Sequence, residues 1–261
     1  MDLTTLVGLL LGFGAILASV FMEGGKVSSL IQAPAFVLIF FGTLGASIVG
    51  TRSKDLRAVP KALGSAFMRT EQDPYELIDR LVQMAERARR EGLLALQDDV
   101  ASLGNPLLIR GVQMIVDGTD PEVVKATMET QVELDEHRKL SAASFLDSAG
   151  GYAPTIGIIG TVMGMVNVLS NLSNPEQLAH SIALAFLATF YGILTANLVW
   201  LPLGKKVKEN IAYETLLGKM CVAGVTGLQT GEAPRSLREK LEAYISEASP
   251  AKRAARGGDD R

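Results

Sequence analysis

Four apolar stretches of membrane length alternate with charged stretches along this chain. They cover about residues 3–21, 34–50, 150–169 and 181–204. A run of about 20 apolar residues forms a helix long enough to cross a bilayer, and the last two stretches contain no Asp, Glu, Lys or Arg. The first stretch has no Lys or Arg before it and is longer than a typical secretion-signal core, which favours a retained helix. The pattern predicts an all-α integral membrane protein with four transmembrane helices.

The polar regions between and after these spans are also helical by pattern. In residues 74–92, apolar side chains recur at helical spacing and charged side chains occupy the rest of the wheel. Further helices are predicted over residues 93–103, 106–116, 121–149, 205–228 and 236–245. No helix breaker follows residue 121 before Gly150, which allows that helix to continue into the third span. The tail 251–261 has the composition of a disordered segment.

Lys and Arg are distributed very unequally along the chain. All of the 25 except Lys26 lie in residues 52–147 and 205–261. Because cytoplasmic segments of membrane proteins carry an excess of Lys and Arg, both termini and the middle segment are predicted to be cytoplasmic. We therefore expect transmembrane helices 1 and 2 in 1–51, a cytoplasmic helical domain in 52–147, transmembrane helices 3 and 4 in 148–204, and cytoplasmic helices with a disordered tail in 205–261.

The sequence offers little that could support enzymatic chemistry. Its two His and single Cys, at positions 137, 180 and 221, have no spacing typical of a metal site or of a nucleophile with its base. His137 is interpreted as solvated, His180 as a cap at the start of the fourth span, and Cys221 as a packed, reduced thiol. Gly157 and Gly160 partly match a dinucleotide-binding loop, but they lie within a span and follow no strand. We expect no enzyme activity and no cofactor.

The third and fourth spans hold hydroxyl groups and prolines at positions that suggest an ion path. Thr161 lies near the middle of its span, and Thr189, about nine residues into the antiparallel next span, reaches a similar depth. A transported cation needs oxygen ligands where it sheds water, so Thr161, Thr189 and Thr155 are candidate ion-path residues. For any single Thr, a bond to its own helix backbone is the simpler explanation. Pro154 and Pro202, near the cytoplasmic ends, favour a hinge or a gate.

A family resemblance rests on the stretches ARREGLLALQ (88–97), VDGTDPEVV (116–124), YAPTIGIIGTVMGMV (152–166) and ATFYGILTANLVWLPL (188–203). Over nearly its full length the chain resembles the MotA/PomA stator subunits of the bacterial flagellar motor. The resemblance implies a ring of five subunits in the inner membrane around two copies of a single-span MotB/PomB partner, whose Asp binds the ion. It also implies roles in ion flow and conformational change for Pro154 and Pro202. A supplied Asp agrees with the absence of a carboxylate from the spans.

The resemblance further implies a contact with the rotor protein FliG. Arg89 and Arg90 match the basic side of that contact. Where the family usually has Glu, this chain has Gln97, so the acidic role, if kept, passes to Asp98 or Asp99. Membrane lipid and further copies of the chain are the other expected partners, and nucleic acid is not expected.

Sodium is the expected ion, with possible ligands at Thr161 and Thr189, and a proton-driven stator is the alternative. A dehydrated sodium ion needs several oxygen ligands, whereas a proton needs only a carboxylate and water. Family members that use sodium resemble this chain at Thr161, while proton-using members tend to have Ala there; Thr189 is shared by both. Two other classes remain open. One is an ExbB/TolQ-like energiser of outer-membrane processes, which has three spans in a different order, and the other is a non-conducting membrane scaffold.

Overall fold

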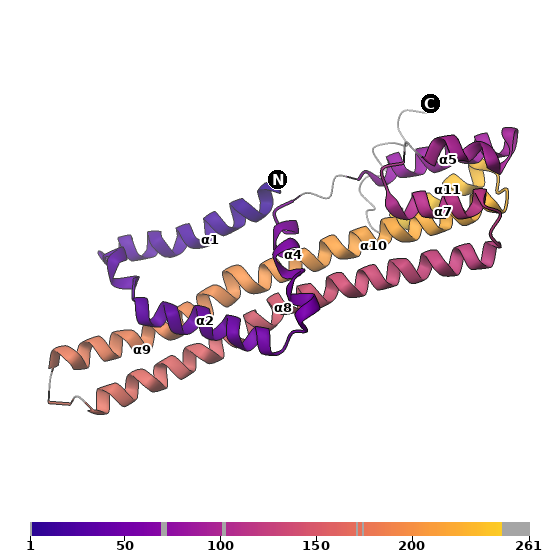
Figure 1. Ribbon diagram of the computed structural model, residues 1–261. Coiled ribbons are helices and arrows are strands. Elements are labelled where there is room, and N and C mark those ends of the chain that lie inside the picture. The colour runs from indigo at the N-terminus through magenta and orange to yellow at the C-terminus, as the bar shows by residue number, and fades with distance from the viewer. Residues whose placement is uncertain (1, 69–71, 101–102, 171, 174, 247–261) are drawn as a thin grey trace. The chain divides into compact units, whose positions relative to one another are not determined.

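The computed structural model describes residues 2–68, 72–100, 103–170, 172–173 and 175–246, and its regular elements are all helical (Figure 1). The chain divides into two compact units. Residues 1–69 and 138–210 form the first, here called the membrane unit, and residues 70–137 and 211–261 form the second, here called the head unit. Two of the three divisions fall inside the long helices over 121–170 and 201–229, and the first lies between the helices over 59–65 and 74–91, so residues 52–68 and 138–147 belong to the membrane unit. The expected tail 251–261 lies outside the described residues.

The membrane unit contains all four of the predicted apolar stretches as helices. Its elements are α1 (Leu3–Met22), η1 (Val27–Leu30), α2 (Ala33–Val49), α3 (Ser53–Leu56), α4 (Val59–Ser65), the second part of α8 (Pro121–Ser170), α9 (Pro175–Thr195), the π-helical η3 (Ala196–Trp200) and the first part of α10 (Leu201–Gln229). As the sequence allowed, α8 continues without interruption into the third span.

Three of the described helices are long and apolar enough to cross a membrane: α1, α8 and the continuous helix over 177–229. The helix α2 has 17 residues. At 1.5 Å per residue it measures about 25 Å, at the lower end of what spans a bilayer. The helix α9 begins at Pro175, because proline suits the first helical position, so His180 lies inside the helix and the interpretation as a cap is wrong.

The helix α2 and the turn before it are held against α9. The buried side chains of α2 recur every four residues, which places Ala35, Ile39, Thr43 and Ser47 on one face. The Tyr191 hydroxyl of α9 donates to the carbonyl of Leu30 and accepts from the amide of Gln32 at 3.1 Å. Backbone groups of the η1–α2 connection are thereby satisfied by a side chain, which matters in surroundings that contain little water.

The head unit is a helical domain whose helices pack around large buried apolar side chains. It contains α5 (Pro74–Glu91), η2 (Leu93–Leu96), α6 (Gln97–Val100), α7 (Pro106–Val116), the first part of α8, the second part of α10, and α11 (Pro234–Ser246). Helix α5 starts at Asp73, whose side chain accepts from the amide of Tyr75, and ends at Gly92, whose φ of 87° suits glycine. Of the helix expected over 93–103, residues 101–102 lie outside the described residues, and 93–100 form a 3₁₀ turn followed by a single α turn, after a bend at Gly92 and with Leu96 buried.

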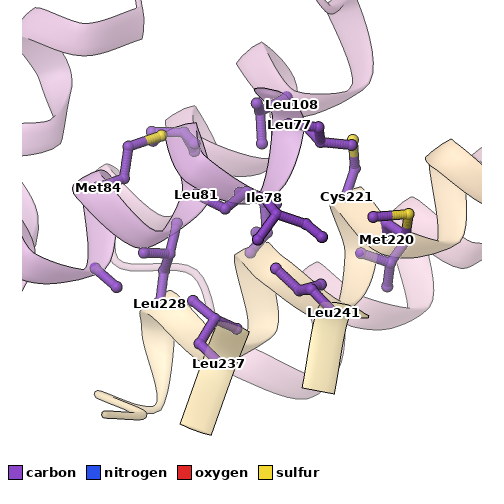
Figure 2. Packing of buried hydrophobic residues seen from close by; sticks show 14 of the residues in the cluster. Leu77, Ile78, Leu81, Met84, Leu108, Met220, Cys221, Leu228, Leu237 and Leu241 are labelled. Carbon is purple, nitrogen blue, oxygen red and sulfur yellow. The ribbon is translucent and has the colours of Figure 1, made fainter. Parts of the chain in front are cut away.

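Large apolar side chains from α5, α7, α10 and α11 form the core of the head unit. Figure 2 shows Leu237 and Leu241 of α11 among side chains of α5 and α10, including Ile78 and Leu228. The face of α5 that the 74–92 pattern predicted as buried is the face that lies in this core. Burial of this area is the main stabilising contribution to the head unit.

Candidate functional site

In the membrane unit, α8 and α9 approach each other through small residues (Figure 1). A Cβ added to Gly157 would lie 3.0 Å from the Cα of Thr189, and one added to Gly160 would collide with the Cβ of Ala188. Backbone cannot yield as a flexible side chain can, so these glycines set the separation of the two helices. We call this contact the α8–α9 seam; its small residues are Ala153, Gly157, Gly160, Gly164, Ala185, Ala188 and Gly192.

The close approach brings the hydroxyls of Thr161 and Thr189 into contact, and we call these two side chains the hydroxyl pair. Thr161 Oγ1 lies 3.1 Å from the Gly157 carbonyl oxygen and 3.4 Å from that of Ala185. Thr189 Oγ1 lies 3.2 Å from the same Gly157 oxygen. The bond of Thr161 to its own helix is therefore present, as the simpler explanation required, but a second hydroxyl and a carbonyl of the facing helix also surround it.

The hydroxyl pair forms a small cluster in which oxygen lone pairs outnumber hydrogens. Two hydroxyl protons face two hydroxyl oxygens and the carbonyl oxygens of Gly157 and Ala185. Each hydroxyl carries two lone pairs, so acceptor capacity remains after both protons have been used. Such a cluster can accept hydrogen bonds from water or coordinate a hard cation.

Thr155 does not join this cluster. Its side chain is exposed in the isolated chain, and its hydroxyl donates to the carbonyl of Tyr152 at 2.8 Å. It lies six residues before Thr161, about 120° away around the helix, since successive residues are about 100° apart. Its place in an ion path stays a prediction.

The two prolines occupy different kinds of helical position. Pro154 lies inside α8, and its Cα would be 3.2 Å from a Cβ added to Gly192. Pro202 lies in the first turn of α10, directly after the π segment η3. A proline has no N–H to close the α-helical ladder, and π turns often mark functional sites in helices. The sequence pattern indicated an irregularity here through Pro202, but not the π turn itself.

Polar side chains beside η3 bond to the preceding helical turn. Asn197 Nδ2 donates to the carbonyl of Ile193 at 2.8 Å, and Thr195 Oγ1 donates to that of Tyr191 at 2.8 Å. Such a bond satisfies a polar side chain within its own helix, which matters where water is scarce. The hinge or gate roles of Pro154 and Pro202 stay predictions.

In the head unit, the predicted rotor residues Arg89 and Arg90 are exposed in the last turn of α5. Cations are favoured there by the negative end of the helix dipole. Gln97 and Asp98 are exposed as well, whereas Asp99 is half-buried. The structure therefore leaves the arginines accessible, as a contact role requires.

Both aspartates are held by Arg87, a residue that the sequence analysis did not single out. Its guanidinium contacts Asp98 at 3.1 Å, Asp99 at 2.7 Å and Glu91 at 3.0 Å. We call these four residues the Arg87 cluster. The hydrogen bond to Glu91 and the charge of Asp99 raise the pKa of Arg87, against desolvation. Any acidic contribution of Asp98 or Asp99 to a rotor contact must compete with this internal pairing.

Other titratable groups behave as structural residues. Cys221 is buried, which confirms the packed thiol, and burial raises its pKa to about 12. Its sulfur lies 3.8 Å from Nδ2 of Asn105. His137 is exposed, as expected. Over the residues that the structure describes, no three His, Cys, Asp or Glu side chains gather in a way that could hold a metal ion.

Comparison with known proteins gives the family. The N-terminal model of motility protein A matches residues 6–92, and the model of the MotA/TolQ/ExbB proton channel family matches residues 100–220. Motility protein A of Bacillus subtilis is 34% identical over 98% of this chain and 96% of its own length. This chain belongs to the motility protein A family. Chemotaxis protein PomA of Vibrio alginolyticus is 30% identical, over 96% of this chain and 98% of its own.

Chains in solved MotAB structures share the fold of this chain over nearly its whole length. The flagellar MotAB stator complex of Bacillus subtilis contains a chain with a TM-score of 0.90 and 33% identity, covering 99% of this chain and 100% of that one. A chain of C. jejuni MotAB has a TM-score of 0.90 and 31% identity, covering 96% and 98%. As a motility protein A, the chain is a flagellar stator subunit and not an enzyme, and these full-length matches favour this over an ExbB/TolQ-like energiser.

Proposed function

We propose that this stator subunit forms, with a MotB/PomB-type partner, a channel that converts a sodium gradient into torque on the rotor. The observation that carries the proposal is the hydroxyl pair. Thr161 and Thr189 meet across the α8–α9 seam beside the carbonyl oxygens of Gly157 and Ala185. Hydroxyl and carbonyl oxygens can replace the water that a sodium ion sheds, and a proton would not require them.

The partner is proposed to supply the ion-binding carboxylate. The described α8 and α9 helices carry no Asp, Glu, Lys or Arg within the third and fourth spans, so the oxygen cluster lacks a counter-charge of its own. Large apolar side chains of α8, among them Ile159 and Val162, are exposed in the isolated chain. An exposed apolar face favours burial against lipid, the partner or further copies of the chain. The MotAB complexes among its relatives support this assembly, for which we propose a homopentamer around two partner chains.

Both termini and the head unit are proposed to lie in the cytoplasm, with four spans in the inner membrane. Lys206, just after the fourth span, pairs with Asp2 at 2.6 Å, which puts the start of α1 and the end of the fourth span on one side. The side that carries nearly all the Lys and Arg is the cytoplasmic side. Arg89 and Arg90 would then face the rotor protein FliG, with Arg87 holding the neighbouring acids.

The proposal predicts how rotation depends on sodium. Motor speed is measured against external sodium, at fixed membrane potential and pH, in the wild type, Thr161→Ala, Thr161→Ser and Thr155→Ala. Wild-type speed should rise with sodium, Thr161→Ala should need several-fold more sodium, and Thr161→Ser should stay close to the wild type because it keeps the hydroxyl. Thr155→Ala tests separately whether Thr155, whose hydroxyl donates to the carbonyl of Tyr152 in its own helix, lies in the ion path, and a sodium dependence like that of the wild type would remove Thr155 from it.

Two results would contradict the proposal. Wild-type rotation that is indifferent to sodium would leave a proton-driven stator, for which the hydroxyl pair serves only to hold the seam. A flat conductance record from the chain reconstituted with its partner would favour a non-conducting scaffold.

A further inference from the structure

The chain at the C-terminal end of α4 accepts three hydrogen bonds, two from the start of α1 and one from α10. A helix end leaves its last carbonyls without intrahelical partners. Here the carbonyls of Ser65, the last residue of α4, of its cap Ala66 and of Phe67 beyond it accept hydrogen bonds from other elements, and that of Ser65 also accepts from the amide of Met68 at 3.2 Å. The bonds run from Asn210 Nδ2 to Ser65 O (2.9 Å), from Thr5 Oγ1 to Ala66 O (3.0 Å) and from the Asp2 amide to Phe67 O (2.9 Å). Asn210 belongs to α10 and the other two donors precede or begin α1, so α4 bridges two long helices.

Asp2 also contacts α10 directly. One carboxylate oxygen accepts from the amide and hydroxyl of Thr4, which caps α1, and the other lies 2.6 Å from Nζ of Lys206. The two paired side chains are only 16% and 29% exposed. Partial burial and the additional hydrogen bonds distinguish this pair from the exposed pairs on the same helix, which contribute little. The bond with Lys206, followed by those with Thr4, lowers the pKa of Asp2 to about 2, so the pair is intact at neutral pH.

The α10 groups in this arrangement lie just beyond the irregular end of the fourth span. Lys206 and Asn210 are four residues apart, hence on one face of α10, and Lys206 follows Pro202 by about one turn. Lys208, between them, pairs with Asp147 of α8. The first turns of α10 after η3 and Pro202 are therefore attached to α1, α4 and α8, and not free to bend alone. We call Asp2, Thr5, Lys206, Asn210 and the three carbonyls of residues 65–67 the α4 junction.

We infer that Asp2 is a positioning residue whose pairing with Lys206 in the α4 junction makes α1, α4 and the start of α10 move as one block when the Pro202 end of the fourth span shifts. The inference rests on the proposed motor function. Without the junction, a displacement at Pro202 would be absorbed by bending of α10. With it, the displacement reaches the first span and the α3–α4 connection as well, so ion flow is converted to torque with less slip.

The experiment compares single changes with their charge reversal. Asp2→Asn keeps a side chain that caps α1 but removes the charge, and Lys206→Gln removes the other half of the pair. Each should leave the membrane level and ion conductance near wild type and lower torque at high load several-fold. Asp2→Lys combined with Lys206→Asp should restore part of the torque, since it restores the ion pair but not the hydrogen bonds by which Asp2 caps α1. Lys205→Gln is the matched control, because Lys205 is 81% exposed and its only pair in the described residues is a 3.9 Å contact with Glu209.

A second measurement does not depend on the motor. Amide hydrogen exchange over residues 59–68 of the assembled complex should rise in Asp2→Asn and in Asn210→Ala and stay unchanged in Lys205→Gln. Unchanged exchange in both junction variants would overturn the inference, as would normal torque at every load in Asp2→Asn. If torque, conductance and membrane level all fell together and the charge reversal failed to restore them, Asp2 would be a folding residue only, which also contradicts the inference. A wild type that does not conduct would contradict the proposed function and leave the exchange result to decide the junction.

Discussion

The α8–α9 seam of the membrane unit and the core of the head unit are both built from helices, but they pack through different kinds of side chain. The α8–α9 seam uses Gly and Ala, with the hydroxyl pair in its middle. The head core uses Leu, Ile and Met, many of them fully buried (Figure 2). In lipid an apolar side chain gains nothing by leaving its surroundings, so close backbone contact and hydrogen bonds hold helices together, whereas in water burial of large apolar groups does.

This difference determines in which unit packing and function can be changed independently. In the seam the same close approach that packs the helices also brings two hydroxyls and two carbonyl oxygens together, so a change in packing is a change in the candidate ion path. In the head unit the core lies away from the exposed arginines of α5, so core and contact residues can be altered independently. The predictions below test this contrast, beginning with the largest effect.

The seam should be the least tolerant region. A Cβ on Gly192 would collide with the carbonyl oxygen of Ala153, which is backbone and cannot move aside. Gly192→Val should therefore remove most of the assembled stator from the membrane, as measured by membrane levels and by recovery of the complex in detergent. Gly14→Val is the control in α1, since a Cβ there meets nothing within 4 Å. Equal recovery of both variants would show that the seam is more plastic than its geometry indicates.

The head core should respond to loss of volume instead. Leu81 is 0% exposed and its side chain lies against Gly224. Leu81→Ala should lower the free energy of unfolding of the head unit by about 2–5 kcal/mol, because a cavity is left behind. Thermal unfolding and protease sensitivity of the purified complex measure this. Leu94→Ala, at a side chain that is 71% exposed, should change stability by no more than about 0.5 kcal/mol.

Cys221 tests how well the head core excludes water. Burial raises its pKa from 9.0 to about 12, so the folded protein keeps the thiol proton at a pH where the unfolded chain has lost it. The contribution of this group to the free energy of unfolding is therefore fully present below pH 9. Above pH 9 the free energy of unfolding falls by at most about 1.4 kcal/mol per pH unit. Cys221→Ala should remove that decline. Maleimide should label Cys221 only after unfolding, and rapid labelling of the native complex at neutral pH would contradict the sealed core.

The smallest effect is expected at the surface of the head unit. Arg87→Gln breaks the pairs with Asp98, Asp99 and Glu91. The exposed pairs with Glu91 and Asp98 contribute only about 0–1 kcal/mol each, and only the pair with Asp99 is half-buried. Stability should therefore fall by less than in Leu81→Ala, while the loss of the Arg87 charge alters the charge presented beside Arg89 and Arg90. Motility is measured in Arg87→Gln and in Arg89→Glu with Arg90→Glu. A stability loss as large as that of Leu81→Ala would place Arg87 in the fold of the head and not in its surface chemistry.

Much of the helical architecture could be predicted, because helical spacing and apolar length are local properties. The amphipathic 74–92 helix, the 106–116 helix, the 236–245 helix and the continuity of α8 into the third span are all present. Predictions that depended on neighbouring elements were less reliable. His180 is not a cap, because Pro175 begins the helix earlier, and residues 93–100 form a 3₁₀ turn and a single α turn in which Leu96 packs into the head core.

In the candidate site, too, local features could be predicted from the sequence and contacts between elements could not. Thr161 and Thr189 could be placed at similar depth from the rise of a helix, and the glycines indicated close packing. Only the packing of α8 on α9 showed that the two hydroxyls meet and that Thr155 points elsewhere. Helical spacing could indicate the pair of Arg87 with Glu91, four residues away, but not the pairs with Asp98 and Asp99, which are 11 and 12 residues away.

By itself, the sequence determined that this protein is helical, that it alternates membrane-length and charged segments, and that its third and fourth spans lack a carboxylate, because these follow from residue type and spacing along one chain. The tertiary structure alone decided which groups meet: the hydroxyl pair across the seam, the Arg87 cluster and the α4 junction. Those contacts join residues up to 204 positions apart, as Asp2 and Lys206 show. Side-chain contact over such separations depends on how helices pack, and local propensity carries no information about it.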